Sequence, residues 1–415
     1  MKKFAKFLLF LVFLGVVGGI ISNRNSDSSS GSYDSGSTVI IDTYAETEDT
    51  MPDASDTDST PFGEYLVAFP DDSLLWGYTQ LNAAEQQAYR SIRNAAAAYY
   101  TGMISMEISY DSLNRVCDAI EFDHPEIFWY DGNLTYYTGG NGDMVSSVTL
   151  QYNMEQSEIP LTQVYIDNYI SGCLADPDFV TAETDFQRIL AVYRYLVAHT
   201  EYDEAYSQQQ SVVSLMQEGK AVCQGYAESF CLIMHHLGFP CAVVDGLSSQ
   251  DWVLSTDGHA WNTVMLEGQW YNVDVTWGDP IRSEGDDPTA PADAYILVND
   301  ELFDRDHTDF NELGSPQCTA MDYNYHKYYG LLHSVWDESY FRWAVQAQKD
   351  LGLGWAQVRY DNYEAYYQAK SALIDGDLLG DIVVDMGFGK QEDGYTSWTY
   401  GYDDTTGVIR VKLIY

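Results

Sequence analysis

Apolar side chains recur every three or four residues in two stretches near the middle of the chain. The first stretch follows Thr184, and the second begins at Cys223 and ends before Gly238. This spacing places apolar side chains on one face of a helix, and glycine commonly follows a helix end. We therefore predict two amphipathic helices, with buried faces formed by Phe186, Ile189, Leu190, Tyr193, Leu196 and Val197 in the first and by Ala227, Phe230, Cys231 and Met234 in the second.

Two strand-like runs, residues 259–266 and 269–276, follow the second helix and are separated by a Glu-Gly pair. A two-residue loop of this kind closes a tight β-hairpin. When this loop pairs Leu266 with Gln269, Asp274 becomes the diagonal neighbour of His259 on one face of the hairpin. A shift of one residue would place these two on opposite faces. The same register gives the other face a nearly continuous apolar surface: Ala260, Val264, Leu266, Tyr271, Val273 and Val275.

Shorter periodic runs lie on both sides of this middle part. Asn82 and Glu85 form a capping signal before a helix that we expect to run to about residue 100. Near the carboxyl end, strand, helix and strands follow in the order also found in residues 107–152, and we put forward a degenerate repeat of one small α/β unit as a hypothesis. The other elements that we predict are a helix from Ser112, a helix at 363–373, and strands at 127–130, 134–137, 145–152, 241–245, 357–360, 382–385, 395–400 and 408–415.

The amino-terminal pattern is different. Three lysines precede an apolar run over residues 7–21, which suits a signal-peptide core and is short for a spanning helix. Bulky residues occupy the place of a good cleavage site, so an uncleaved anchor is the alternative. In both cases the lysine-rich side stays inside and the rest of the chain faces outside. The following acidic, Ser/Asp/Gly-rich residues bury too little surface to fold and are expected to form a tether.

These patterns give a fold class and a division of the chain. We predict an α+β protein in which a helix packed on an antiparallel sheet forms the core, flanked by smaller α/β units. The expected segments are a signal peptide or signal anchor at 1–22, a disordered acidic linker at 23–61, an amino-terminal α/β region at 62–175, a central domain at 176–305 and a carboxyl-terminal α/β region at 306–415.

Composition restricts the possible partners. The chain has 415 residues, and its formal net charge of −43 argues against nucleic acid, whose phosphates require a basic surface. Six cysteines in an exported chain permit disulfides, but their pairing does not follow from the sequence. Neither a paired-cysteine motif nor a calcium loop is present, so we predict no metal and no cofactor.

The middle part carries the most specific chemistry. Cys223 lies at the amino end of a predicted buried helix, where unpaired N–H groups and the helix dipole favour a thiolate and a developing oxyanion. His259 and Asp274 follow in the order of a base and its orienting carboxylate. Each residue alone has an ordinary explanation: a buried thiol, a strand histidine and a capping aspartate. Order, helix start and hairpin register together favour a nucleophilic cysteine site.

Residues 220–227 (KAVCQGYA), 259–262 (HAWN) and 270–277 (WYNVDVTW) are similar to motifs of the transglutaminase-like superfamily of the papain-like cysteine fold. The resemblance covers roughly residues 181–299. It implies that Cys223 is the nucleophile, His259 the general base and acid, and Asp274 the orienting residue. Residues 123–129 (DHPEIFW) also resemble a segment found beside such domains in exported bacterial proteins.

This resemblance leaves the reaction open. It implies an acyl-thioester on the cysteine, formed from a glutamine carboxamide or a peptide carbonyl of an extracellular protein or wall peptide. We expect an exported acyltransferase, either anchored in the cell membrane or secreted. The alternatives are a cysteine protease or amidase with the same three residues, and a non-catalytic surface-binding module.

Overall fold

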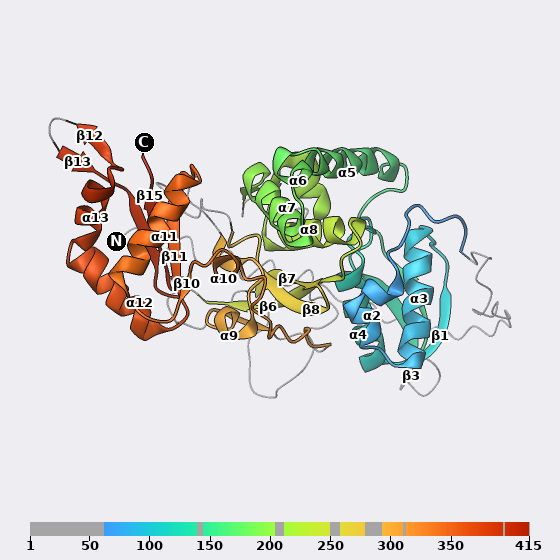
Figure 1. Ribbon diagram of the computed structural model, residues 1–415. Helices are drawn as coiled ribbons and strands as arrows, with labels where there is room; N and C mark the ends of the chain where they lie inside the picture. Colours follow the sequence, from blue (N-terminus) through green and yellow to red (C-terminus); the bar gives the residue numbers. More distant parts are fainter. Residues whose placement is uncertain are drawn as a thin grey trace, which may run out of the picture.

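The computed structural model describes residues 62–138, 144–203, 211–249, 258–278, 293–309, 313–392 and 395–414. The predicted segments at 1–22 and 23–61 lie outside the described residues. Three groups of elements follow one another along the chain: an amino-terminal unit, a central core and a carboxyl-terminal unit (Figure 1). The core lies between the other two, and its sheet and helices carry the residues singled out above.

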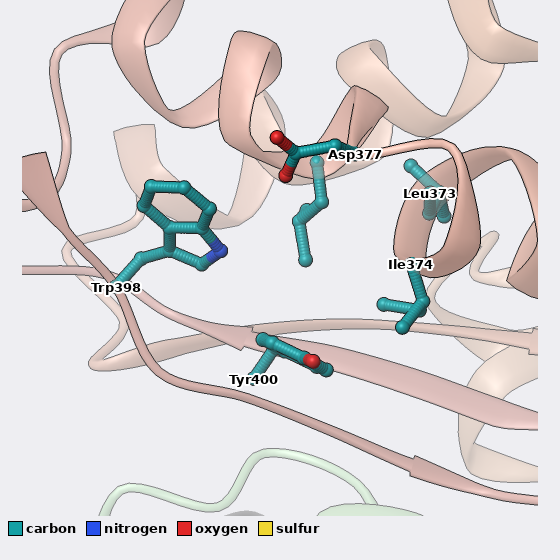
Figure 2. A pocket seen from close by; sticks show the side chains of 6 residues that line it. Leu373, Ile374, Asp377, Trp398 and Tyr400 are labelled. Atoms are coloured by element: carbon teal, nitrogen blue, oxygen red, sulfur yellow. The ribbon is translucent and has the colours of Figure 1, made fainter.

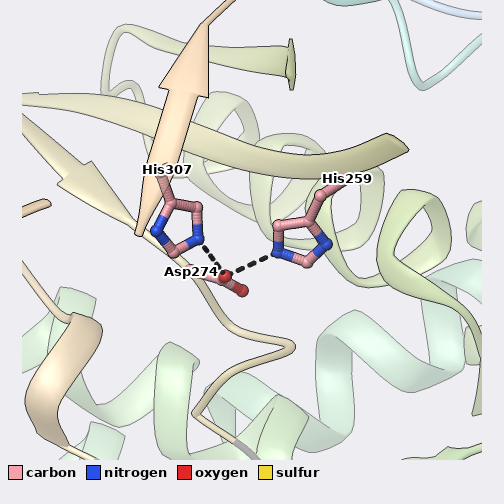
Figure 3. Close-up of side chains that lie close together, drawn as sticks. All are labelled: His259, Asp274 and His307. Atoms are coloured by element: carbon pink, nitrogen blue, oxygen red, sulfur yellow. Dashed lines mark hydrogen bonds and ion pairs between the residues drawn. The ribbon is translucent and has the colours of Figure 1, made fainter. Parts of the chain in front are cut away.

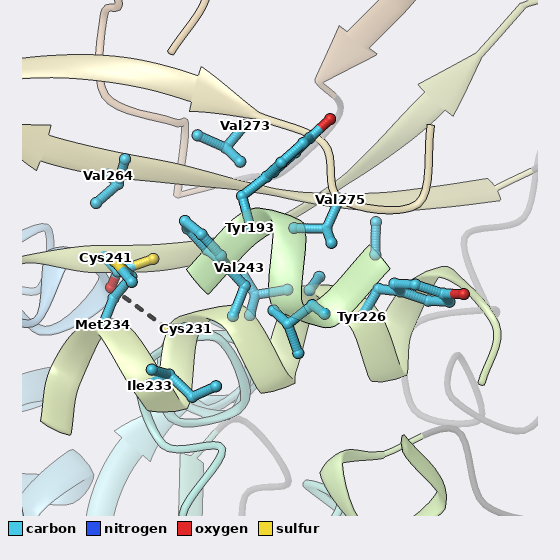
Figure 4. Close-up of a cluster of buried hydrophobic side chains, with 14 of the residues drawn as sticks. Tyr193, Tyr226, Cys231, Ile233, Met234, Cys241, Val243, Val264, Val273 and Val275 are labelled. Carbon is cyan, nitrogen blue, oxygen red and sulfur yellow. Dashed lines mark hydrogen bonds between the residues drawn. The ribbon is translucent and has the colours of Figure 1, made fainter. Parts of the chain in front are cut away.

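The core sheet has four antiparallel strands in the order β8-β7-β6-β9. Helix α8 (Cys223–His236) packs against β6 (Cys241–Ser248) and β7 (Gly258–Leu266), as predicted for a helix on an antiparallel sheet. Helix α7 (Asp185–His199) packs against α8, and its first turn has the capping box of Thr184 and Gln187. Apolar side chains from α8 and from both central strands meet in a common core (Figure 4).

The hairpin of β7 and β8 (Gln269–Val273) has the predicted register. Leu266 pairs with Gln269, and Glu267 and Gly268 between them have φ values of 50° and 77°. Two consecutive left-handed residues are typical of the type I′ turn that joins tight hairpins. The predicted apolar face is buried throughout: Ala260, Val264, Leu266, Tyr271, Val273 and Val275.

The fourth strand of the core sheet, β9 (His307–Asp309), comes from beyond the predicted boundary at residue 305. It pairs with β6, where Gly246 lies opposite Asp309. A Cβ atom at Gly246 would lie 2.1 Å from the indole of Trp261, so only glycine leaves room for that ring. The core sheet therefore includes a strand from the segment that the sequence pattern assigns to the carboxyl-terminal region.

The amino-terminal unit is a three-stranded antiparallel sheet with two helices. Helix α3 (Ala83–Ala97) begins with the predicted capping box of Asn82 and Glu85. The strand predicted at 127–130 is wrong, because these residues form consecutive turns: Ile127 N–H donates to His124 and Tyr130 N–H donates to Ile127. The apolar run is buried by packing in the core rather than by pairing in a sheet. The strands and second helix are β1 (Ile104–Ser109), α4 (Tyr110–Asp123), β2 (Leu134–Thr138) and β3 (Met144–Leu150).

In the carboxyl-terminal unit, the strand predicted at 382–385 is a helix, α13 (Leu378–Met386). Its β-branched residues favour a strand by propensity, but Leu379, Ile382 and Val383 form a buried helical face. Left-handed residues at both ends bound the helix. The other elements are β10 (Leu332–His333), α11 (Glu338–Asp350), β11 (Trp355–Tyr360), α12 (Tyr363–Lys370), η5 (Ser371–Asp375), β12 (Lys390–Glu392), β13 (Tyr395–Ser397), β14 (Tyr400–Asp403) and β15 (Val408–Lys412).

The two flanking units share the order of three strands, and the second unit has a fourth strand, β10, which pairs in parallel with β11. In the first, β1 pairs with β3 and β3 with β2; in the second, β11 pairs with β15 and β15 with β14. All four pairings are antiparallel, and in each unit a helix follows the first strand. Because β10 has no counterpart among the described residues of the first unit, the repeat stays a hypothesis.

The remaining elements are the 16-residue helix α5 (Ile159–Leu174) and several short helices and strands. Within the described residues, none of the helices combines the length and the apolar character needed to cross a membrane. The short elements are η2 (Asp72–Leu74), α2 (Trp76–Thr79), α6 (Pro177–Val180), β4 (Glu201–Tyr202), η3 (Ser214–Glu218), β5 (Lys220–Ala221), η4 (Asp293–Tyr295), α9 (Asp300–Phe303) and α10 (Tyr325–Tyr328).

Candidate active site

His259 and Asp274 meet at one edge of the core sheet. His259 is the second residue of β7, and Asp274 follows β8 directly. The imidazole Nε2 lies 2.7 Å from the Asp274 Oδ2, and both side chains are buried (Figure 3). Pairing of the hairpin stops at Val273, and the Asp274 N–H donates to the carbonyl of Tyr295 instead. The carboxylate therefore reaches His259 from a residue that has just left the sheet.

Cys223 completes the set predicted from the sequence. It is the first residue of α8, is half-buried, and is a hydrogen-bond partner of His259. Because Nε2 contacts Asp274, Nδ1 is the ring atom available to the thiol. No side chain caps the first turn of α8, so its N–H groups remain available for an anion at Cys223.

Cys223 differs from the other cysteines in its surroundings. All six cysteines lie in the described part of the chain, and none is in a disulfide. The other five are buried, and burial raises the pKa of the Cys173 thiol to about 12. A thiol that stays protonated and covered reacts slowly, so half-buried Cys223 is the candidate reactive position.

The charges of His259 and Asp274 stabilise each other. Burial lowers the pKa of His259, but the contacts with Asp274 and Cys223 outweigh it and raise the pKa to about 10. Burial raises the pKa of Asp274, whereas contacts with His259 and His307 hold it well below its usual range. The pair is thus an imidazolium beside a carboxylate at neutral pH, which suits a base that must hold a proton taken from a thiol.

Asp274 has contacts that the sequence patterns did not predict. Its Oδ2 also lies 3.0 Å from Nε2 of His307, and its Oδ1 accepts the Trp277 N–H at 2.9 Å. On the other side of the His307 ring, Nδ1 lies 2.6 Å from Oδ1 of Asp306. The Tyr295 hydroxyl donates to the second oxygen of Asp306 at 2.6 Å. The adjacent Asp306-His307 pair was the available sequence signal, but it lay outside the predicted central domain.

The donor types of His259, Asp274 and His307 could also hold a metal ion, since their ligand atoms lie within 4.8 Å of one another. The observed separations of 2.7 and 3.0 Å are hydrogen-bond lengths. Nitrogen and oxygen ligands about 2.0–2.1 Å from a tetrahedral zinc would lie roughly 3.4 Å apart. The arrangement therefore fits direct N–H donation to the carboxylate better than shared metal coordination.

We expect metal chelation to leave the chemistry of Cys223 unchanged. Incubation with EDTA followed by dialysis should alter the rate of Cys223 alkylation by less than about twofold, because the imidazole is held by hydrogen bonds rather than by a metal. Alkylation is followed by mass spectrometry. A large loss of rate that added zinc restores would contradict this prediction.

Carboxylates gather between the core and the amino-terminal unit. Glu121 of α4, Glu228 of α8 and Asp245 of β6 repel one another. Burial raises the pKa of Glu228 and of Asp245 to about 7, with a smaller contribution from neighbouring carboxylates. Burial and the same neighbours raise the pKa of Glu121 well above its usual value. As an acid with a raised folded-state pKa, each makes the fold less stable as pH rises from about 4.5 through its folded pKa.

Glu121→Gln should therefore stabilise the protein at alkaline pH. We expect Tm to rise by about 2 °C at pH 8, corresponding to about 1 kcal/mol, with little change at pH 4.5. The measurement is thermal unfolding followed by circular dichroism at both pH values. Glu183→Gln, at an exposed position, is the matched control and should change neither. An equal gain at both pH values would contradict charge repulsion as the cause.

A pocket with a volume of about 340 Å³ lies in the carboxyl-terminal unit (Figure 2). Trp398 lies on one side, Leu373 and Ile374 lie on the other, Asp377 lies above and Tyr400 lies below. Its lining includes no cysteine and no histidine. The lining therefore offers neither a thiol nor an imidazole for acyl transfer.

The protein has a mixed α+β fold, and its core is similar to one known superfamily. Residues 175–275 match the family model of the transglutaminase-like superfamily. This segment contains Cys223, His259 and Asp274, the three residues that meet in the structure.

The chain is similar to kyphoscoliosis peptidase. It is 32% identical to the human protein over 184 residues, covering 39% of this chain and 27% of the relative. The mouse protein is 29% identical over 196 residues, covering 42% of this chain and 29% of the relative. The chain thus spans less than a third of the length of these relatives. A solved structure described as the crystal structure of a TGase covers 37% of this chain and 45% of its own, with 17% identity and a TM-score of 0.26.

Proposed function

We propose that the protein is a cysteine-dependent acyltransferase that forms a thioester with a glutamine carboxamide or a peptide carbonyl. The observation that carries this proposal is the meeting of Cys223, His259 and Asp274 at the start of a buried helix. In the first step, the Cys223 thiolate attacks the carbonyl carbon while the proton taken from the thiol stays on His259. The oxyanion is stabilised by N–H groups at the start of α8. His259 then gives its proton to the leaving nitrogen, the C–N bond breaks, and the thioester remains.

The second half of the reaction breaks the thioester and regenerates the free enzyme. His259 removes a proton from the incoming amine or water, which attacks the thioester carbonyl and expels the Cys223 thiolate. Asp274 keeps the imidazole oriented and stabilises its charged form in both halves. An amine gives transamidation, and water gives hydrolysis.

Water is the second candidate acceptor. The relatives that align with this chain are named peptidases, which favours hydrolysis of a peptide or amide bond. The same three residues would serve, because only the acceptor differs. We propose an extracellular protein or wall peptide as the substrate, with the chain held at the membrane by its amino-terminal segment or secreted; the lysine-rich start and the apolar run after it support this placement.

The product distinguishes these reactions. The full chain is incubated with a glutamine-rich protein and a labelled primary amine, with Cys223→Ala beside it, and masses are read by spectrometry. Amine incorporation that Cys223→Ala loses supports transamidation. Backbone cleavage or deamidation that Cys223→Ala loses supports the hydrolase. Products that form equally in both samples would contradict the proposed function.

A further inference from the structure

His307 has an unusual position for a histidine that the proposed chemistry does not require. Its ring is fully buried, with Nε2 at 3.0 Å from Asp274 and Nδ1 at 2.6 Å from Asp306. Rings surround its faces and edges: Phe303 stacks on it at 4.0 Å between centroids, and Trp277 lies at 4.6 Å. Water is thus kept from both hydrogen bonds.

Two carboxylates on one ring determine its protonation. Carboxylate oxygens accept hydrogen bonds, so each ring nitrogen donates and the ring carries both protons. Asp306 is held as an acceptor from its far side, where its Oδ2 takes the Tyr295 hydroxyl. The negative charge of Asp306 also attracts the buried guanidinium of Arg359 in β11. The geometry therefore places a cationic His307 beside Asp274.

The same oxygen of Asp274 serves both histidines. Nε2 of His259 and Nε2 of His307 both contact Oδ2, and the two ring centroids are 5.5 Å apart (Figure 3). One carboxylate charge is therefore shared between two cations. A like charge at this distance disfavours the protonated form of its neighbour.

Tyr295 is held by residues far away in the sequence. It ends η4, whose Asp293 accepts from the Gln357 amide at 2.9 Å and from the Arg194 guanidinium at 3.0 Å. The Arg359 guanidinium donates to the carbonyl of Ala294 at 2.8 Å. Because Gln357 and Arg359 belong to β11, the carboxyl-terminal unit supports the segment that orients Asp306.

We propose that His307 is a positioning residue that fixes the Asp274 carboxylate and, as a second cation on the same oxygen, weakens the hold of Asp274 on the proton of His259. Asp306 is the carboxylate that contacts the other ring nitrogen of His307, and Tyr295 holds Asp306 in position. This inference rests on the proposed function of Cys223, His259 and Asp274. Its consequence is that His259 releases its proton to the leaving group more readily than Asp274 alone would allow.

Other charged groups also face the two rings. His259 faces Cys223 and Asp274, and Asp245 from β6 lies close enough to interact with it. His307 faces Asp274 and Asp306, and Asp304 lies nearby. Burial raises the pKa of Asp245 to about 7 and that of Asp304 to about 6. Both carboxyls are ionised above pH 8, so they do not titrate where the test below reads His259.

The test follows alkylation of Cys223 by iodoacetate in the full chain. The carboxylate of this reagent is attracted by protonated His259, so the rate falls at alkaline pH as His259 loses its proton. His307→Gln keeps an N–H donor near the position of Nε2 but carries no charge. Asp306→Asn has nearly the same shape as the native side chain and removes the negative charge beside Nδ1 of His307. In both variants we expect the alkaline limb to move upward by about one pH unit.

One further variant, compared with His307→Gln, separates the effect of position from the effect of charge. His307→Phe removes both N–H donors of the ring. We expect it to lower the maximal alkylation rate at least about tenfold, because Asp274 loses the hydrogen bond from His307 that helps to position it. His307→Gln should restore most of that rate. The matched control is His124→Gln: His124 is likewise buried with both ring nitrogens bonded, to Glu126 and Tyr89, but it lies in the amino-terminal unit. Its pH profile should coincide with that of the wild type.

The outcomes distinguish this inference from the function on which it rests. If wild-type Cys223 reacts rapidly and His259→Gln removes that reactivity, the proposed site stands. Alkaline limbs that coincide in wild type, His307→Gln and Asp306→Asn would then overturn the role of His307 alone. Slow alkylation of the wild type, unaffected by His259→Gln, would overturn both.

Discussion

Replacing Cys223 by alanine is expected to remove the activity, with a fall of about 10⁴-fold or more in the rate of product formation. The sulfur of Cys223 is the atom that bonds to the acyl group. The other five cysteines are buried and cannot replace it. Alanine at the first position of α8 leaves the helix and its buried face in place, so the fold is expected to survive. The rate is measured by mass spectrometry of the substrate identified in the amine-incorporation experiment.

Cys173→Ala is the matched control for this prediction. Cys173 is fully buried on α5, and burial raises the pKa of its thiol to about 12. Its loss should leave the rate per folded molecule unchanged and lower only the stability. Equal activity in Cys223→Ala and the wild type would exclude Cys223 as the nucleophile.

Replacing Asp274 has the second large effect, on both stability and rate. Asp274→Ala leaves two buried imidazoles and the Trp277 N–H without their acceptor, and we expect a loss of about 3–5 kcal/mol of unfolding free energy. The milder Asp274→Asn keeps the shape but not the charge, and the rate should fall by about 10⁴-fold. Chemical denaturation measures the first quantity, and turnover of the same substrate measures the second.

Replacing Asp274 should also change how the free energy of unfolding depends on pH. The lowered pKa of Asp274 gives stability that is present above its unfolded pKa near 3.8 and is lost as pH falls further. The raised pKa of His259 gives stability that is fully present below about pH 6.5 and is lost as pH rises through about 10. Asp274→Asn should flatten both limbs. Exposed Asp185→Asn should alter unfolding by less than about 0.5 kcal/mol, and a similar change in both variants would contradict the role given to Asp274.

The residues of the candidate site were predictable because short stretches of sequence determine their positions. The Glu-Gly turn sets the hairpin register, and one apolar face allows only that register, so His259 and Asp274 were expected on one side. The apolar period after Cys223 and the stop at Gly238 placed the cysteine at a helix start. The structure brings the three together as these local signals require.

His307 was not predictable in the same way. It lies 33 residues beyond Asp274 and reaches it only because β9 pairs with β6, a contact that three residues of strand do not signal. The two wrong strands have related causes. The apolar runs at 127–130 and 382–385 are buried, but a short apolar run does not distinguish a strand from a turn or a helix.

The claim that Cys223 carries an acyl group is tested most directly by trapping that group. The full chain is mixed with p-nitrophenyl acetate, quenched in acid and digested, and the peptides are read by mass spectrometry. Our account predicts one acetyl group on Cys223, removable by neutral hydroxylamine as a thioester is, and formed at least about 100-fold more slowly in His259→Gln. No acetyl group on Cys223, or the same rate in His259→Gln, would contradict it.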